Sequence, residues 1–261
     1  MVLAAGGLTT TLFQIKLIMW MCRSISMRPQ VLTTSESKRV QDILFEILFS
    51  QLANTNCLHC IECFDTLFNA SFIIQGHWQS SPMWRQKTWI ALYTRSLSCI
   101  KQEPQEWGAY IGSLFCICRL IQVVDLKVPF VSTPDLIPLA VKALAHRTPE
   151  RTSINVNDVQ TILQRQALES IVKISTIDSA SIAPYVSTIL PIILTFCCES
   201  PASSDRLKGL ECILQLSKLP YSFLFPLQRF VVRRLNKVID DPKRRVRQLA
   251  SKARNAWLTI K

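Results

Sequence analysis

The stretch Tyr221–Lys261 reads YSFLFPLQRFVVRRLNKVIDDPKRRVRQLASKARNAWLTIK and predicts two helices joined by a tight corner. The corner is Asp240-Asp241-Pro242. Asp is a favoured helix N-cap because its carboxylate accepts hydrogen bonds from free backbone N–H groups. Pro at a first helical position loses no backbone hydrogen bond. We therefore expect one helix over about 226–239 and a second over about 242–260.

Both predicted helices are amphipathic, with apolar residues recurring at helical spacing. The apolar side of the second consists of Val246, Leu249, Ala250, Ala253 and Trp257. The apolar side of the first consists of Leu227, Val231, Leu235, Val238 and Ile239. A helical hairpin with apolar residues on both helices needs neighbours, so we expect the rest of the chain to supply similar hairpins.

The composition favours an all-α protein of 261 residues. Only six glycines are present, and no Asn-Gly or Asp-Gly hairpin signal occurs. Ten cysteines are scattered without a paired framework, which indicates reduced thiols in the cytosol or nucleus. Cys116, Cys118 and Cys212 lie in apolar helical runs and are expected in the core. We expect no membrane span; a signal or anchor at the N-terminus is the alternative, although Gln14 and Lys16 interrupt its apolar run.

The same pattern continues upstream and predicts a repeat. Further helices are expected over 36–52, 57–72, 83–100, 106–124, 135–146, 156–177, 180–198 and 205–216, after a first helix around residues 12–22. Pro134, Pro184 and Pro226 stand where the first helix of a pair should begin, with separations of 50 and 42 residues. Helix pairs with a period in the low forties are typical of HEAT solenoids. We predict a HEAT/armadillo-like solenoid over 1–261, with about five helix pairs plus one leading helix and a last repeat at 221–261.

Positive charge is concentrated at one end of the chain. Residues 201–261 contain 14 Lys and Arg against 4 Asp and Glu, which is a net charge of +10. The net charge of the whole chain is +12, so nearly all of it lies in this end. This basic end should meet an acidic protein surface or nucleic acid. We expect Lys243, Arg244, Arg245 and Arg254 to form the partner surface. Aromatic residues do not interleave the basic ones, so we expect no stacking on nucleic acid bases. The alternative to a protein-binding surface is a basic module that binds nucleic acid.

Two other residues of the last hairpin are expected to have structural roles. Arg247 should brace Asp240 or Asp241, and Trp257 should lie in the core of the last repeat rather than on its surface.

The last sixty residues resemble a known family. The motif residues are Arg206, Gly209, Leu210, Glu211, Cys212, Leu216, Leu219, Pro220, Val232, Arg234, Leu235 and Lys237, followed by Asp240, Asp241, Lys243, Arg244, Val246, Arg247, Ala250, Ala253, Arg254 and Trp257. They are similar to the C-terminal region of the large HEAT-repeat adaptor of the cytosolic iron–sulphur protein assembly targeting complex, the MMS-nineteen nucleotide-excision-repair family. Members are several times longer, so the chain is either a fragment or a short homologue without the N-terminal arm.

The resemblance implies a non-catalytic scaffold of the cytoplasm and nucleus. Its implied partners are a small MIP-eighteen-family subunit and a WD-repeat propeller. Its implied clients are apoproteins, such as DNA helicases and polymerases, that require iron–sulphur clusters. No cofactor of its own is implied.

One motif and several absences bear on catalysis. Cys57, Cys60 and Cys63 follow the C-x-x-C-x-x-C spacing of ferredoxins, but Leu67 occupies the position of the expected fourth cysteine. The three thiols also lie in a helical pattern, so we interpret them as buried structural cysteines. An iron–sulphur or zinc carrier that uses this cysteine run is the alternative. The sequence contains no Walker loop, hydrolase elbow or glycine-rich dinucleotide turn, and we expect no enzymatic activity.

Overall fold

The computed structural model describes residues 82–101, 107–123, 132–146 and 156–260, together with Arg39, Ile43, Glu46 and Ile61. All regular structure in these ranges is helical, which confirms the predicted all-α class. The chain divides into two compact units, Met1–Val123 and Val124–Lys261. The helices expected before residue 82 lie almost entirely outside the described residues.

The described part of the first unit is dominated by a helix pair, α5 (Pro82–Lys101) and α6 (Trp107–Val123), which pack on each other. Helix α6 is buried along most of its length because its sequence is apolar on nearly every side. Cys116 and Cys118 are fully buried there, as predicted.

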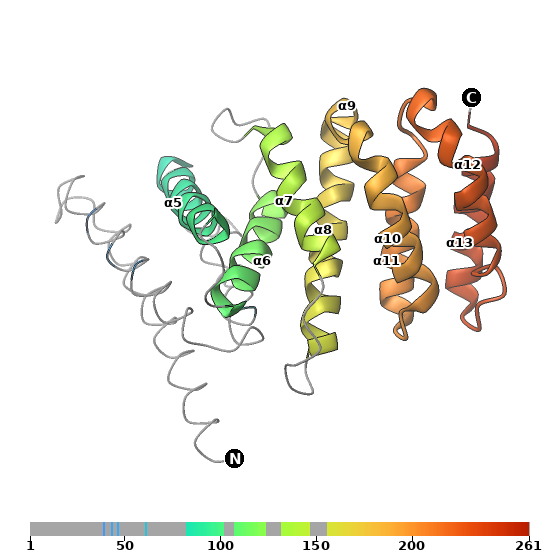
Figure 1. Cartoon of the computed structure of the whole chain (residues 1–261), viewed down its shortest axis with the longest axis horizontal. Helices are drawn as coiled ribbons and strands as arrows, with labels where there is room; N and C mark the ends of the chain where they lie inside the picture. The colour runs from blue at the N-terminus through green and yellow to red at the C-terminus, as the bar shows by residue number, and fades with distance from the viewer. Residues whose placement is uncertain are drawn as a thin grey trace, which may run out of the picture. The chain divides into compact units, whose positions relative to one another are not determined.

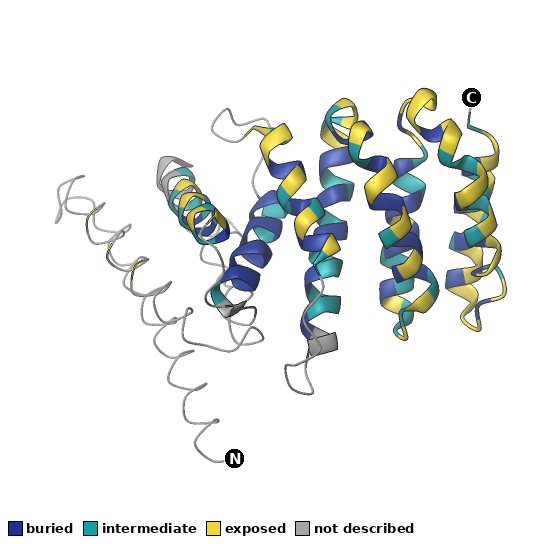
Figure 2. Ribbon diagram, in the orientation of Figure 1, coloured by how far each residue is buried: buried dark blue, intermediate teal, exposed yellow. Residues whose placement is uncertain are grey.

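The described residues of the second unit form three helix pairs. Its elements are α7 (Thr133–Ala145), α8 (Val156–Ile177), α9 (Ser179–Ile182), the 3-10 turn η1 (Ala183–Tyr185), α10 (Val186–Glu199), α11 (Ser203–Leu216), α12 (Tyr221–Asn236) and α13 (Arg244–Leu258). Helix α10 packs between α7 and α12, and the three helices form one row. Helices α8, α11 and α13 form a second row against it (Figure 1). Figure 2 shows buried and exposed residues on the long helices of this unit, as expected where neighbouring helices cover one side of each.

The helix ends at the last corner differ from the prediction. Helix α12 begins at Tyr221, after Pro220, and Pro226 lies inside it rather than at its start. Helix α13 begins at Arg244 rather than Pro242. The Asp241 carboxylate does not cap a helix: its Oδ1 accepts a hydrogen bond from the backbone N–H of Lys243, at 2.8 Å. Such a turn is a common alternative use of Asp near a corner.

The proline prediction holds for only one of the other two pairs. Pro134 lies at the start of α7, as expected, because a first-turn residue needs no backbone N–H partner. Pro184 lies in η1, between the short helix α9 and α10.

The core of the last two helix pairs contains a buried indole, which joins the two pairs, and a close contact between the two helices of one pair. Trp257 is fully buried, as predicted, and its Nε1–H donates to the carbonyl of Ile213 on α11 at 3.0 Å. Gly209 on α11 faces Cys197 on α10, and a Cβ placed on Gly209 would lie 2.3 Å from the Cys197 Sγ. The absence of a side chain at residue 209 is therefore what allows α10 and α11 to approach so closely.

One described helical stretch, Ser179–Glu199, is apolar and long enough to cross a membrane by composition alone. Half of its most apolar window is buried inside the protein. Since α10 packs against α7, α11 and α12, we interpret it as a core helix of the second unit.

A candidate protein-binding surface at α12 and α13

Ion pairs join the second row of helices from one pair to the next. Arg165 on α8 donates through Nε to the Oδ1 of Asp205 at the start of α11, at 2.7 Å. Asp205 is almost completely buried. Its other oxygen accepts a hydrogen bond from the Ser200 hydroxyl at 3.3 Å. This contact therefore fixes the position of α11 relative to α8.

The next helix pair is joined by a similar Arg–Asp contact, although its acid lies at the corner before the helix instead of in the first helical turn. Arg206 on α11 donates to Asp241 through Nε at 2.7 Å and through Nη2 at 3.2 Å. The side chains of Arg206 and Asp241 are only 11% and 7% exposed. Two parallel hydrogen bonds between a guanidinium and a carboxylate fix distance and orientation together. The corner before α13 is thus held by α11.

The surroundings of Asp241 favour its ionised form. Burial alone acts to raise the pKa of Asp241. The Lys243 N–H, the hydrogen bonds from Arg206 and the charges of Arg206 and Arg247 together outweigh burial, so the pKa of Asp241 lies below its usual value. The carboxylate is therefore charged near neutral pH and acts as the counter-ion of the Arg206 guanidinium.

The predicted brace between Arg247 and Asp241 is confirmed, but the contact is made to the backbone. Arg247 Nη1 donates to the carbonyl oxygens of Asp241 at 2.8 Å and Pro242 at 3.1 Å. The carboxylate of Asp241 is instead occupied by Arg206. Arg247 therefore holds its own corner, and Arg206 holds the same corner from the preceding hairpin.

The four residues predicted to bind a partner lie on or beside α13. Lys243, Arg244 and Arg245 are exposed at its start. Arg254 is half-buried, and its Nε donates to the Oδ1 of Asn236 on α12 at 2.8 Å. The first three are therefore available to a partner, whereas Arg254 links the two helices of the hairpin.

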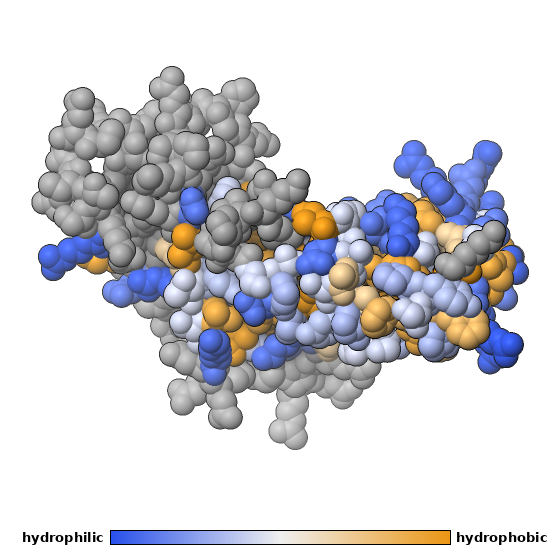
Figure 3. Space-filling view, turned by 90° about the horizontal axis from the view of Figure 1, so that it is seen from above, coloured by the Kyte–Doolittle hydropathy of each residue, from blue (hydrophilic) through white to orange (hydrophobic). Residues whose placement is uncertain are grey.

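Aromatic residues are exposed on α12, and one of them, Phe230, lies between Arg229 and Arg233, so the statement that no aromatic residue interleaves the basic ones was wrong. Tyr221, Phe223, Phe225 and Phe230 are between 40% and 57% exposed. Phe230 also lies under the guanidinium of Arg234, whose Cζ is 6.0 Å from the ring centre. Figure 3 shows hydrophilic and hydrophobic side chains side by side at the end where α12 and α13 lie. Aromatic and arginine side chains together are the residues most often dominant in protein interfaces.

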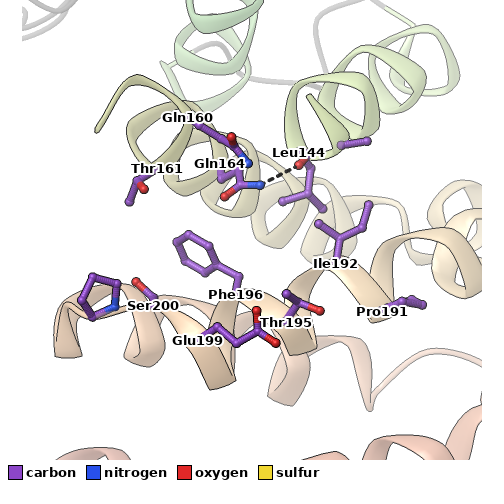
Figure 4. A pocket seen from close by; sticks show the side chains of 12 residues that line it. Leu144, Gln160, Thr161, Gln164, Pro191, Ile192, Thr195, Phe196, Glu199 and Ser200 are labelled. Carbon is purple, nitrogen blue, oxygen red and sulfur yellow. Dashed lines mark hydrogen bonds between the residues drawn. The ribbon is translucent and has the colours of Figure 1, made fainter. Parts of the chain in front are cut away.

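A groove of about 830 Å³ lies between the α7–α8 pair and helix α10 (Figure 4). Gln164 crosses part of it and donates to the carbonyl of Leu144 at 3.2 Å. Ile192 and Phe196 of α10 form an apolar part of its wall. Glu199 is the one ionisable side chain among the lining residues. The groove thus offers a mixed polar and apolar surface without a pair of acid–base groups.

The three cysteines of the predicted ferredoxin-like spacing, Cys57, Cys60 and Cys63, lie outside the described residues. Within the described ranges, no cluster of three or more His, Cys, Asp or Glu could hold a metal ion. Burial raises the pKa of the Cys116 thiol to about 12. Thiols so far from ionisation are poor nucleophiles and poor metal ligands.

The ion pair between Arg206 and Asp241 was not predicted, because the basic residues of this end were interpreted mainly as a partner-binding surface. One signal in the sequence could have indicated it: Arg165, Arg206 and Arg247 follow one another at a constant spacing of 41 residues. A spacing close to the helix-pair period places these side chains at equivalent positions of successive pairs.

Paired helices stacked in two rows, joined from one pair to the next by Arg–Asp ion pairs, define an α-helical repeat protein. No family model matches the chain. The chain is 25% identical over 246 residues to the MMS19 nucleotide excision repair protein homolog of Bos taurus. The aligned segment covers 94% of this chain and 22% of that protein. The homolog of Dictyostelium discoideum is 26% identical over 181 residues, or 68% of this chain and 16% of that protein. A shorter segment of 61 residues, 23% of this chain and 6% of that protein, is 44% identical to the Xenopus tropicalis homolog.

These matches confirm the resemblance that the terminal motifs indicated. The chain is similar to a C-terminal region of the MMS19 nucleotide excision repair proteins. It spans less than a quarter of the length of these relatives.

Proposed function

We propose that this chain is a non-catalytic scaffold segment that serves DNA repair by binding other proteins. In its finer form, the proposal makes the chain part of the targeting complex of cytosolic iron–sulphur protein assembly. Two observations support it. The chain is similar to proteins named for nucleotide excision repair, and the exposed cations and aromatic rings of α12 and α13 have the composition of a protein interface.

The geometry suits a scaffold because the binding surface is held rigidly. The nearly buried pair between Arg206 and Asp241 fixes the corner from which Lys243, Arg244 and Arg245 project. A partner then binds a preformed surface and loses little free energy in ordering it. The positive charges would attract an acidic partner and increase the rate of association more than the final affinity.

The proposed partners are the small MIP-eighteen-family subunit and the WD-repeat propeller. The proposed clients are apoproteins that need iron–sulphur clusters, including DNA helicases and polymerases. We place the scaffold in the cytoplasm and nucleus, without a cofactor or a membrane association of its own.

Co-purification tests this function. The full chain carrying an affinity tag would be mixed with the two purified core subunits, and circular dichroism would show that the chain is folded. Retention of at least one subunit is the expected result. A variant with Arg244→Glu and Arg245→Glu should retain less, because it reverses two exposed charges. A folded chain that retains neither subunit contradicts the proposal.

Nucleic acid binding is a second candidate, favoured by the exposed Phe and Arg residues on the same helix α12. Gel shifts with single- and double-stranded DNA across a range of salt concentrations distinguish it. Binding through phosphates would weaken steeply as salt increases, with a slope set by the number of phosphates contacted. An affinity for DNA no tighter than millimolar at low salt would exclude this role.

A further inference from the structure

Arg206 shows how this fold divides the donors of one guanidinium. Its Nη1 donates to two carbonyls at the start of its own hairpin corner, Ser200 at 2.8 Å and Pro201 at 2.9 Å. Its Nε and Nη2 point the other way and hold the carboxylate of Asp241 in the following pair. One side of the guanidinium is thus anchored to its own backbone, and the other side binds an acid from the next structural element.

Arg247 repeats the first half of this arrangement, 41 residues later. Helices α11 and α13 also begin 41 residues apart, at Ser203 and Arg244. Arg247 Nη1 donates to the two equivalent corner carbonyls, those of Asp241 and Pro242. The guanidinium is therefore already oriented by its own backbone.

Arg247 makes no contact of the second kind with the described residues. The hydrogen bonds of Arg247 in these ranges all involve Nη1. The Nε–Nη2 side, which in Arg206 binds a carboxylate, has no acceptor among the described residues. Arg247 is also exposed, so this side is accessible to another molecule.

The residues that accompany Arg247 on the surface of α13 indicate which kind of molecule could bind there. Arg244, Gln248, Ser251 and Asn255 recur at helical spacing on α13, opposite its buried side. This outward surface is polar, and Arg244 adds a positive charge to it. A molecule that docks here therefore gains little from apolar burial and more from charge complementarity.

We propose that the Nε–Nη2 side of Arg247 binds a carboxylate of an acidic partner protein, presented in the first turn of one of its helices or at the corner just before that helix. The position of the carboxylate follows from the two occupied examples: Asp205 lies in the first turn of α11, and Asp241 lies at the corner before α13. The partner then continues the row of Arg–Asp pairs that joins α8, α11 and α13. The inference rests on the proposed scaffold function and specifies how its partner is held.

Arg247→Lys is the informative variant, and Arg245→Lys is its control. Both keep the charge of the exposed α13 surface, but lysine cannot form two parallel hydrogen bonds to one carboxylate. Isothermal titration of the full chain with the two core subunits would measure each affinity. We expect Arg247→Lys to weaken binding about tenfold or more, and Arg245→Lys to change it less than about twofold. Urea unfolding of both variants would show whether Arg247→Lys also loosens the corner, and equal midpoints assign the loss to the contact.

The possible outcomes separate this inference from the proposed function. If the wild-type chain binds a core subunit and the two lysine variants bind it equally less tightly, the role of Arg247 is overturned and the scaffold function stands. A folded wild-type chain that binds neither subunit overturns the function, and this inference with it. If sedimentation shows that the wild-type chain self-associates and Arg247→Lys does not, a second copy is the occupant and the assignment to a partner protein is wrong.

Discussion

Substitution of Asp241 by Asn should destabilise the second unit through a contact that links two helix pairs. Asp241 accepts hydrogen bonds from Arg206 at 2.7 and 3.2 Å and from the Lys243 N–H at 2.8 Å. Asn keeps the bond to Lys243 but removes the negative charge, so Arg206 remains nearly buried without its counter-ion. Hydrogen bonds to charged groups contribute about 1.5–3 kcal/mol each, and removal of one partner of a buried ion pair costs about 3–5 kcal/mol. Because Asn keeps part of the contact, we expect a loss of about 2–3 kcal/mol.

Urea unfolding followed by circular dichroism would measure this loss as a lower midpoint at constant slope. Asp240→Asn is the matched control, since it removes the same charge one residue earlier at an exposed position and should change stability by less than about 0.5 kcal/mol. A double-mutant cycle with Arg206→Gln should give a coupling energy of about 1–3 kcal/mol. Equal effects of Asp240→Asn and Asp241→Asn, or additive effects of Arg206→Gln and Asp241→Asn, would refute the reasoning.

Four further predictions follow from the same structure. The stabilisation by Asp241 should be complete above about pH 4, the usual pKa of an unfolded Asp, and should decline as the pH falls through its lower folded pKa; wild-type and Asp241→Asn unfolding curves that keep their full separation at pH 2 would contradict this. Gly209→Ala should lose about 1–3 kcal/mol from overpacking against Cys197, and Cys197→Ala should relieve most of that loss; a more stable Gly209→Ala protein in thermal unfolding would show that α10 and α11 are further apart. Trp257→Phe should lose about 1–3 kcal/mol because the buried hydrogen bond from the indole to the Ile213 carbonyl is lost and the smaller ring leaves a cavity, and unchanged stability in urea would count against that packing. Cys116 should react with a thiol reagent only as fast as the protein unfolds, and rapid labelling of this residue under native conditions, located by mass spectrometry, would disprove its burial.

Helix positions were predictable from sequence where apolar periodicity was strong. The expected helix at 156–177 matches α8 residue for residue, because its pattern is regular and polar segments flank it. The start of α12 was misplaced because Pro220 and Pro226 are both acceptable near a helix start and local sequence does not choose between them. The burial of Trp257 was predictable from its position on the apolar side of its helix.

The candidate site was only partly predictable from sequence. The exposure of Lys243, Arg244 and Arg245 followed from their positions off the apolar side of α13. The use of Arg254 to bind Asn236 depends on how two helices meet, which residue spacing within one helix does not specify. The pairing of Arg206 with Asp241 spans 35 residues and similarly depends on how successive hairpins stack.

The most direct test of the proposed scaffold function is a titration of the folded full chain with the small MIP-eighteen-family subunit and the WD-repeat subunit, followed by size-exclusion chromatography with light scattering. The account predicts a stable complex that contains the chain together with at least one of these subunits, weakened when Arg244 and Arg245 are changed to Glu. Separate elution of all three proteins at micromolar concentration, with the chain shown to be folded, would contradict it.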